Sequence, residues 1–246
     1  MVYKDNNIKF IKKVDLSKRV FLMEFKILNG DNFIFYPGQF IALDLLSTNG
    51  EKIRRSYSIS NYDKKEKIIE LVITFIENGN GSNFLCSLKE GSVLTAIGPR
   101  GNFLFKKENP GRHILVGTGT GIVPYKSMLT EISNFLNDEK NSCILIQGVK
   151  FREDIIFRED FEKLSNDKKN FLFKVYLSRE NNHEEKKSYE SFGYVQDYFK
   201  ELNLNAKRDT IYLCGNPYMI EDSINILSEI NFSKEKIVTE KYFKKK

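Results

Sequence analysis

The feature that most constrains the fold of this chain is a change in strand spacing near residue 113. From Asn7 to Phe105, short β-rich runs follow one another closely and are separated by turn signals such as Asn29-Gly30 and Pro37-Gly38. From His113 onward, apolar strands alternate with helix-like stretches. Closely spaced strands are typical of a barrel or sandwich, whereas the alternation is typical of a parallel sheet covered on both faces. We therefore predict two domains of different class.

The strands and helices expected in each half follow from the same patterns. The first half has the strand-like runs NIKFIKKVDL, RVFLMEFKIL, QFIALDLL, RRSYSIS, KIIELVITFI and SVLTAIG, interrupted by one helix from about Gly81-Ser82-Asn83 to Glu90-Gly91. The second half has the strands HILVG, CILIQGV, FLFKVYLS and TIYLCGN, with helices around residues 122–136, 158–165, 194–202 and 217–230. The charged loop KKENPGR separates the halves, so we place one domain at residues 1–106 and the other at residues 107–246.

Composition argues against several classes of protein. A chain of 246 residues with 41% hydrophobic residues can bury a core, so disorder is not expected. No apolar run approaches the roughly 20 residues that span a bilayer, and the start MVYKDNNIKF lacks the apolar region of a signal peptide. The three cysteines are widely spaced, so neither a disulfide framework nor a four-thiolate iron–sulfur cluster is indicated. We expect a cytoplasmic protein without an integral membrane segment or a metal site.

The net charge of +6 has two explanations. It can attract acidic partners, or it can reflect a general enrichment in Lys and Asn. The basic residues do not gather into a recognisable nucleic-acid-binding module, so no nucleic-acid partner is expected.

A glycine-rich turn is the strongest local signal in the second half. The run Gly117-Thr118-Gly119-Thr120-Gly121-Ile122-Val123-Pro124 lies directly after the strand HILV and directly before a helix. Glycines allow close backbone approach, and the free amides at a helix start attract a pyrophosphate. The spacing differs from the G-x-G-x-x-G fingerprint, and a glycine-rich turn can also be purely structural.

Two further segments carry residues suited to ligand binding. In Arg55-Ser56-Tyr57-Ser58, the Arg can neutralise a phosphate, the Tyr face can stack on a planar ring, and a Ser hydroxyl can bind a ring nitrogen. Cys214-Gly215-Asn216-Pro217 follows the strand TIYL, at the carboxyl edge where open α/β sheets bind ligands. Taken singly, the first can be a polar edge strand and Cys214 can be a core residue.

Taken together and in order, these segments resemble the ferredoxin–NADP(+) reductase family. The family's R-x-Y-S motif matches Arg55, Tyr57 and Ser58, its GTGTGIAP motif matches residues 117–124 with Val123 in place of Ala, and its C-G-x-P motif matches residues 214–217. Its pyrophosphate helix matches residues 81–91, and its G-P-x-G turn matches residues 98–101. The resemblance spans nearly the whole chain. It implies an antiparallel FAD-binding β-barrel followed by a parallel-sheet NADP-binding α/β domain.

The resemblance also implies a set of flavin-binding residues. These are Arg55, Tyr57, Ser58, Ile73, Thr74, Gly81, Ser82 and Asn83. Arg55 and Ser82 would hold the FAD pyrophosphate, and Tyr57 would cover one face of the isoalloxazine. Ser58 would hydrogen-bond the flavin N5 region, and the backbone of Ile73 and Thr74 would border the cofactor.

On the nucleotide side, the resemblance implies a second set. The expected NADP(H)-binding residues are Gly119, Thr120, Gly121, Lys150, Ser178, Arg179, Tyr194 and Gln196, with Cys214 and Glu240 at the hydride-transfer position. The choice of NADPH rests on Ser178 and Arg179, because a guanidinium and hydroxyl donors suit a dianionic 2′-phosphate. Lys150 adds a second positive charge. Glu180 follows directly and opposes this choice, since NADH sites usually present an acidic residue to the ribose.

The C-terminal sequence Glu240-Lys241-Tyr242-Phe243 is followed by three lysines. Plant-type members of the family end on the aromatic residue that stacks on the flavin, whereas bacterial members extend further. The resemblance therefore implies that Tyr242 packs on the flavin and that Phe243 packs on the FAD adenine.

The implied activity is electron transfer between NADPH and ferredoxin or flavodoxin, acidic one-electron carriers, through FAD. The direction of electron flow and the oligomeric state are not indicated. A related reductase that feeds an iron–sulfur subunit, or that reduces free flavin or quinone, stays an alternative, although a fused form would carry an extra Cys-rich segment. A non-catalytic FAD-binding regulator is a third, although it would be expected to have lost Ser58, Cys214 and Glu240.

Overall fold

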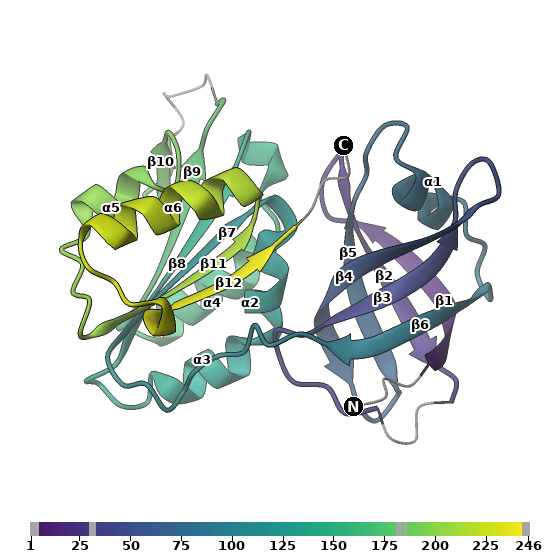
Figure 1. The fold of residues 1–246 in the computed structure, drawn as a ribbon, viewed down its shortest axis with the longest axis horizontal. Coiled ribbons are helices and arrows are strands. Elements are labelled where there is room, and N and C mark those ends of the chain that lie inside the picture. Colours follow the sequence, from purple (N-terminus) through teal and green to yellow (C-terminus); the bar gives the residue numbers. More distant parts are fainter. Residues whose placement is uncertain (1–4, 30–32, 181–183, 185, 243–246) are drawn as a thin grey trace. The chain divides into compact units, whose positions relative to one another are not determined.

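The computed structural model describes residues 5–29, 33–180, 184 and 186–242. They form two compact units (Figure 1). Each unit has its own hydrophobic core. The first unit contains the residues up to Leu104 together with Val123–Met128. The second contains Phe105–Ile122 and the residues from Leu129 onward. A short segment from the second half of the sequence therefore packs with the first unit.

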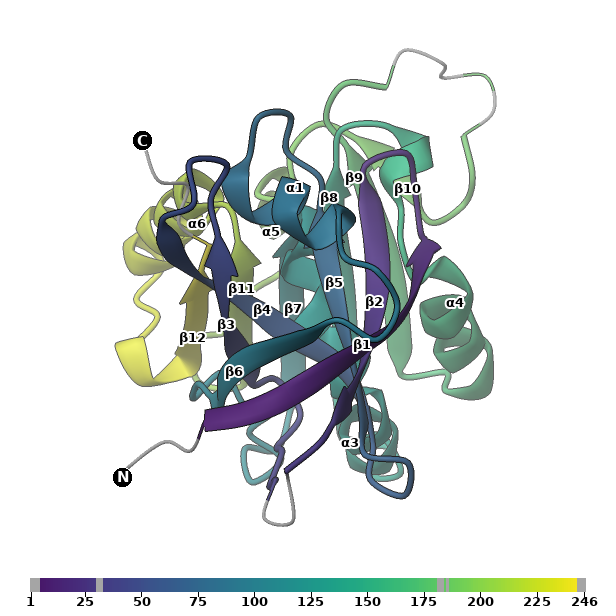
Figure 2. The same ribbon diagram turned by 90° about the vertical axis from the view of Figure 1, so that its right-hand side faces the viewer.

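The first unit is a closed antiparallel barrel with the strand order β1-β2-β5-β4-β3-β6 (Figure 1 and Figure 2). Its strands are β1 (Asp5–Asp15), β2 (Val20–Ile27), β3 (Phe40–Leu46), β4 (Lys52–Asp63), β5 (Ile68–Thr74) and β6 (Val93–Arg100). Alternate apolar side chains point into the barrel, as Ile8 and Phe10 do in β1 and Met23 and Phe25 do in β2. The predicted antiparallel barrel is confirmed.

Helix α1 (Asn80–Cys86) follows β5 and is shorter than the sequence pattern predicts. The helix was expected to continue to Glu90-Gly91, but residues 87–91 form a turn. The amide of Gly91 donates to the carbonyl of Phe10 in β1, at 2.9 Å. The chain leaves the helix early because this stretch is already tied to the sheet.

The second unit is a six-stranded parallel sheet with the order β10-β9-β8-β7-β11-β12. Its strands are β7 (Arg112–Thr118), β8 (Ser142–Val149), β9 (Phe171–Leu177), β10 (Glu190–Phe192), β11 (Asp209–Gly215) and β12 (Ile237–Lys241). The predicted parallel α/β class is confirmed. The two edge strands β10 and β12 escape the sequence analysis because they are short and lack a run of apolar residues.

Helices cover both faces of this sheet. On one face, α5 (Asp197–Glu201) and α6 (Pro217–Glu229) pack on the sheet through Phe199, Ile220 and Leu227. On the other, α3 (Leu129–Phe135) and α4 (Arg158–Asp167) bring Phe135 to His113 and Phe161 to Phe173. Three short 3₁₀ turns complete the unit: η1 (Gly119–Ile122), η2 (Arg152–Asp154) and η3 (Lys234–Lys236).

The single helix expected over residues 122–136 is divided into η1, α2 (Val123–Ser127) and α3. Ser127 explains part of this break. Its hydroxyl donates to the carbonyl of Pro124 at 2.7 Å and accepts from the amide of Gly38 at 2.8 Å. A serine that bonds back to the preceding turn bends a helix, and here it also ties α2 to the barrel unit.

The helices in the described part of the chain are all too short or too polar to cross a bilayer.

Candidate functional site

Two neighbouring arginines of β4 have different surroundings. Arg54 forms a two-pronged ion pair with Asp44, at 2.6 and 3.0 Å, and its hydrogen bonds lower the pKa of that carboxyl. Arg55, on the opposite face of the strand, is half-buried and donates to the carbonyl of Arg54 at 2.9 Å. It has no carboxylate partner among the described residues. Arg55 therefore offers an uncompensated positive charge, as binding of a phosphate requires.

Gly81 brings α1 against the same part of β4. A Cβ atom at this position would lie 3.1 Å from Cγ of Arg55 and 3.3 Å from the hydroxyl of Tyr57. Burial raises the pKa of Tyr57 to about 12, so its hydroxyl stays a hydrogen-bond donor at neutral pH. The structure thus brings together three of the predicted flavin-binding residues, which lie up to 26 positions apart in the sequence.

The other predicted flavin-binding residues differ in their burial and in the hydrogen bonds that they form. Ser82 is buried, and its hydroxyl accepts from the amide of Ile76 at 3.1 Å, so it stabilises the turn before α1. Ser58 is buried opposite Phe40 of β3, and Ile73 points into the core. Thr74 and Asn83 remain accessible at the end of β5 and within α1. The Ser82 hydroxyl also lies within hydrogen-bond distance of the carbonyls of Ile76 and Gly79, at 3.1 and 3.2 Å.

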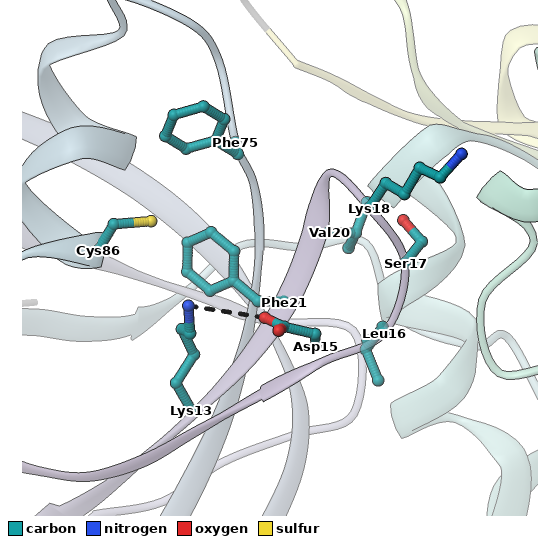
Figure 3. A pocket seen from close by; sticks show the side chains of 9 residues that line it. All are labelled: Lys13, Asp15, Leu16, Ser17, Lys18, Val20, Phe21, Phe75 and Cys86. Atoms are coloured by element: carbon teal, nitrogen blue, oxygen red, sulfur yellow. Dashed lines mark ion pairs between the residues drawn. The ribbon is translucent and has the colours of Figure 1, made fainter.

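A hollow of about 580 Å³ lies on the barrel unit beside the end of β5 (Figure 3). Its lining residues are Lys13, Asp15, Leu16, Ser17, Lys18, Val20, Phe21, Phe75 and Cys86. Val20 and Phe21 pair in register with Thr74 and Ile73. The ammonium of Lys13 lies 5.3 Å from the centre of the Phe21 ring. Lys13 also forms an ion pair with Asp15 at 3.6 Å (Figure 3), so a surface with aromatic and charged side chains adjoins the strand predicted to border the flavin.

In the second unit, glycines pack the turn after β7 onto the end of β11. A Cβ atom at Gly121 would lie 2.3 Å from the carbonyl oxygen of Cys214, and one at Gly215 would lie 2.6 Å from the hydroxyl of Thr118. Gly119 differs, because it is exposed, has a φ of +56° and has nothing within 4 Å of its Cβ position. The glycine motif is therefore both structural, at Gly121, and open to a ligand, at Gly119.

Thr118 and Asn216 join the two loops, and neither was predicted from the sequence to have a role. The Thr118 hydroxyl accepts from the amide of Asn216 at 3.0 Å. The Asn216 side chain accepts from the amide of Tyr218 at 2.9 Å and so caps α6, which begins with Pro217. The Asn-Pro pair is a recognisable helix start and could have been identified from the sequence.

The predicted hydride-site residues meet at the carboxyl edge of the sheet. Cys214 of β11 lies in register with Glu240 of β12. The amide of Tyr242 donates to the carbonyl of Gly215 at 2.8 Å, and its hydroxyl donates to the carbonyl of Thr120 at 3.4 Å. Phe243 lies outside the described residues.

Cys214 is fully buried, and this burial raises the pKa of its thiol well above the usual range. The charge of Glu240 acts in the same direction, while a hydrogen bond with Tyr242 acts against it. The thiol therefore stays protonated at neutral pH and is not a nucleophile.

A pair of positive charges lies where β8 and β9 end. The amide of Arg179 donates to the carbonyl of Lys150 at 2.9 Å, which brings the two residues side by side. Ser178 makes the equivalent bond to Val149 at 3.0 Å. Both cationic side chains are exposed, and neither has a carboxylate partner in the part of the chain that the structure describes. These residues can bind a dianionic phosphate.

The turn that carries Tyr194 and Gln196 lies over the same strand ends. The amide of Gly193 donates to the carbonyl of Leu177 at 3.1 Å, and a Cβ atom at Gly148 would lie 2.6 Å from Val195. The Tyr194 side chain is 66% exposed, so its ring is available for stacking. The Gln196 amide nitrogen lies 3.5 Å from Asp222, and its buried carbonyl oxygen has no hydrogen-bond partner among the residues that the structure describes.

Arg152 is a further residue of this region that the sequence analysis did not identify. It lies in η2 and contacts two carboxylates, Glu180 and Glu190. No local pattern marks it, because its partners lie 28 and 38 positions later.

Two family models match this chain. The family model for the oxidoreductase FAD-binding domain matches residues 7–105, and that for the oxidoreductase NAD-binding domain matches residues 115–224. Ferredoxin–NADP reductase B of Sorangium cellulosum is 31% identical over 211 residues, which cover 83% of this chain and 84% of the relative.

A second sequence relative and one solved structure also resemble the chain. The toluate 1,2-dioxygenase electron transfer component of Pseudomonas putida is 28% identical over 207 residues, which cover 84% of this chain and 58% of the relative. The crystal structure of a ferredoxin NADP+ reductase from Neisseria gonorrhoeae with bound FAD and NADP has a TM-score of 0.82 at 21% identity. It covers 98% of this chain and 99% of that chain, which shows a common fold.

Proposed function

The chain belongs to the ferredoxin–NADP(+) reductase family, and from this premise we propose that it is an FAD-dependent enzyme that moves electrons between NADPH and a small one-electron carrier, ferredoxin or flavodoxin. The observation that carries the choice of NADPH is the pair of uncompensated charges on Lys150 and Arg179. We also propose that residues 1–106 form the FAD domain and residues 107–246 the NADP(H) domain, with α2 packed on the former.

The barrel residues fit FAD. Bound FAD supplies the redox chemistry, since it exchanges a hydride with a nicotinamide and single electrons with a carrier. Arg55 neutralises the pyrophosphate next to Gly81 and Asn83, and Tyr57 covers one face of the ring system. Ser58 donates a hydrogen bond to the ring, and the backbone of Ile73 and Thr74 borders it. The support for these roles is the contact of α1 with Arg55 and Tyr57.

The α/β residues fit NADP(H). Gly119, with its open surroundings, allows the pyrophosphate to approach the backbone, together with Thr120 and Gly121. Ser178, Arg179 and Lys150 bind the 2′-phosphate, while Tyr194 and Gln196 contact the adenosine. These roles are supported by the backbone hydrogen bonds that gather the residues at the ends of β8 and β9.

Cys214 and Glu240 orient the nicotinamide beside Thr120. Two observations support these roles. The register of β11 with β12 pairs Cys214 with Glu240, and the Cys214 thiol is protonated. We further propose that Tyr242 covers the flavin until the nicotinamide displaces it, with Phe243 on the FAD adenine. Tyr242 lies against Thr120 and Cys214, the residues assigned to the nicotinamide.

The function is tested by comparing NADPH and NADH oxidation with an artificial acceptor in the wild type and in Arg179→Ala. The wild type should be yellow and prefer NADPH. The variant should lose about 10- to 150-fold in kcat/KM for NADPH, because a charge-assisted contact is worth roughly 1.5–3 kcal/mol, and should change little with NADH. Lys207→Ala, which removes an exposed charge elsewhere in the unit, is the control. A colourless protein, or a yellow one that does not oxidise NADPH, would overturn the proposal.

The carrier is proposed to be acidic, and the net charge of +6 supports this choice. Reduction of an acidic ferredoxin should slow by about tenfold or more between low and high salt, because screening removes electrostatic steering. Reduction of a neutral quinone should change much less. Lys18→Glu should lower the ferredoxin rate at low salt and flatten its salt dependence, whereas Lys207→Glu should not. Equal salt slopes for the two acceptors would contradict steering.

A second candidate function is that of an electron transfer component that serves an oxygenase. The similarity to the Pseudomonas putida protein favours it, although the chain spans only 58% of that relative. Reduction of an isolated iron–sulfur oxygenase faster than ferredoxin would select it. For either function we propose a cytoplasmic location, since Cys86, Cys143 and Cys214 are all free thiols.

A further inference from the structure

We propose that Arg152 is a positioning residue that sets the coenzyme preference by holding the carboxylate of Glu180 away from the 2′-phosphate. The inference rests on the proposed use of NADPH. Glu180 directly follows Arg179 at the end of β9. In sheets of this kind, an acidic residue at that edge accepts a hydrogen bond from the ribose 2′-hydroxyl and repels a 2′-phosphate. A chain that reads the phosphate must therefore neutralise or withdraw this carboxylate.

Arg152 does both. Its amide donates to Oε2 of Glu180 at 3.2 Å, and its guanidinium lies 4.0 Å from the same oxygen. Only 15% of the Glu180 side chain is exposed. The carboxylate is thus directed toward η2, while Lys150 and Arg179 extend into solvent. The guanidinium, which Glu180 shares with Glu190, offsets part of the Coulomb repulsion that the Glu180 carboxylate would exert on a bound dianion.

Glu190 keeps Arg152 in place. The guanidinium forms two parallel hydrogen bonds with this carboxylate, from Nε at 2.8 Å and from Nη2 at 2.9 Å. Glu190 is buried, with 1% of its surface exposed. Burial acts to raise the pKa of Glu190, but the bonds from Arg152 and from the Lys187 amide lower it overall, so the pair stays charged. Because a two-pronged pair fixes the guanidinium plane, Arg152 cannot turn away from Glu180 without losing it.

The Glu180 carboxylate lies at a surface that a ligand can reach. A hollow of about 580 Å³ is lined by Phe151, Arg152, Glu153 and Glu180. Without Arg152, the lining of this hollow would keep the carboxylates of Glu153 and Glu180 and would lose the guanidinium. The local charge would then favour a ribose hydroxyl over a phosphate.

The test measures binding of adenosine 2′,5′-bisphosphate and of 5′-AMP to the full-length holoprotein by calorimetry, so that it does not depend on turnover. The ratio of the two affinities is compared in the wild type, Arg152→Gln, Glu180→Gln and the double variant. Arg152→Gln should lower the ratio about tenfold, since it removes the positive charge that offsets the Glu180 carboxylate, while the main-chain amide of residue 152 still donates to that carboxylate. Glu180→Gln alone should change it less than about twofold, and the double variant should return it to near the wild-type value.

Each outcome separates the two proposals. A wild type that does not prefer the bisphosphate would overturn the use of NADPH itself. If Arg152→Gln keeps the wild-type preference for the bisphosphate, only the role of Arg152 is overturned. The same holds if Arg152→Gln loses this preference and Glu180→Gln does not restore it, because Arg152 would then contact the phosphate directly. If Arg152→Gln fails to fold with Glu190 left unpaired, Arg152→Gln combined with Glu190→Gln removes both members of the buried pair and is expected to lower the ratio in the same way.

Discussion

Replacing Gly121 with Ala is expected to destabilise the α/β unit by about 3 kcal/mol, the upper part of the usual range for overpacking. The new methyl group would lie 2.3 Å from the carbonyl oxygen of Cys214 and 2.9 Å from Cα of Gly215. Both are backbone atoms of β11, a central strand bonded on both sides, so they cannot move aside as a flexible side chain can. The melting temperature of the unit should fall by about 10 °C, and the KM for NADPH should rise because the turn is displaced.

Gly119→Ala is the matched control within the same motif. Its Cβ would meet nothing within 4 Å, so only the φ of +56° is unfavourable, at a cost of about 1 kcal/mol. Thermal unfolding followed by circular dichroism should therefore rank Gly121→Ala well below Gly119→Ala. Equal or reversed stabilities would show that the turn is not packed on β11 as described.

Acidification should remove on the order of 3 kcal/mol of stability from the α/β unit through His113, because a pKa lowered from 6.5 to about 4 corresponds to roughly this free energy. This side chain is fully buried, and burial lowers its pKa to about 4 from an ordinary value of 6.5. Its Nε2 donates to the carbonyl of Asn109 at 2.8 Å, and its Nδ1 accepts from the hydroxyl of Tyr212 at 3.4 Å. The Tyr212 hydroxyl in turn accepts from the amide of Lys106 at 2.9 Å. This chain of bonds requires a neutral imidazole.

Because the pKa of His113 is lower in the folded protein than in the unfolded chain, the stability falls as the pH falls. The unfolded chain binds the proton at pH values where the folded one does not, so this contribution is fully present above about pH 6.5 and is lost as the pH falls toward about 4. The free energy of unfolding in urea, monitored by hydrogen exchange of the β7 amides, should fall with pH in the wild type and not in His113→Gln. A proton NMR titration in the His183→Gln variant should show no protonation of His113 above pH 5. Protonation of His113 near pH 6.5 would contradict the prediction.

The class of each domain and most of its strands could be predicted from the sequence. Alternating apolar residues and glycine-rich turns are local patterns, and the barrel and the parallel sheet both follow from them. The edge strands β10 and β12 could not be found in this way, since their pairing depends on neighbours rather than on their own apolar content. The division of the helix after β7 was also missed, because the Gly38 amide that bonds to Ser127 comes from the barrel.

The sequence by itself determined which segments carry the candidate site, because each motif is a short run whose residue types suit one chemistry. Which residue of a motif acts was decided only by the tertiary structure. Arg54 is neutralised by Asp44 while Arg55 is left uncompensated, and Gly121 packs on β11 while Gly119 stays open. Likewise, the sequence places an acid beside Arg179, and only the fold brings Arg152 to it. Charge pairing and steric contact depend on distance in space, and the partners here lie 10 to 93 positions away along the chain.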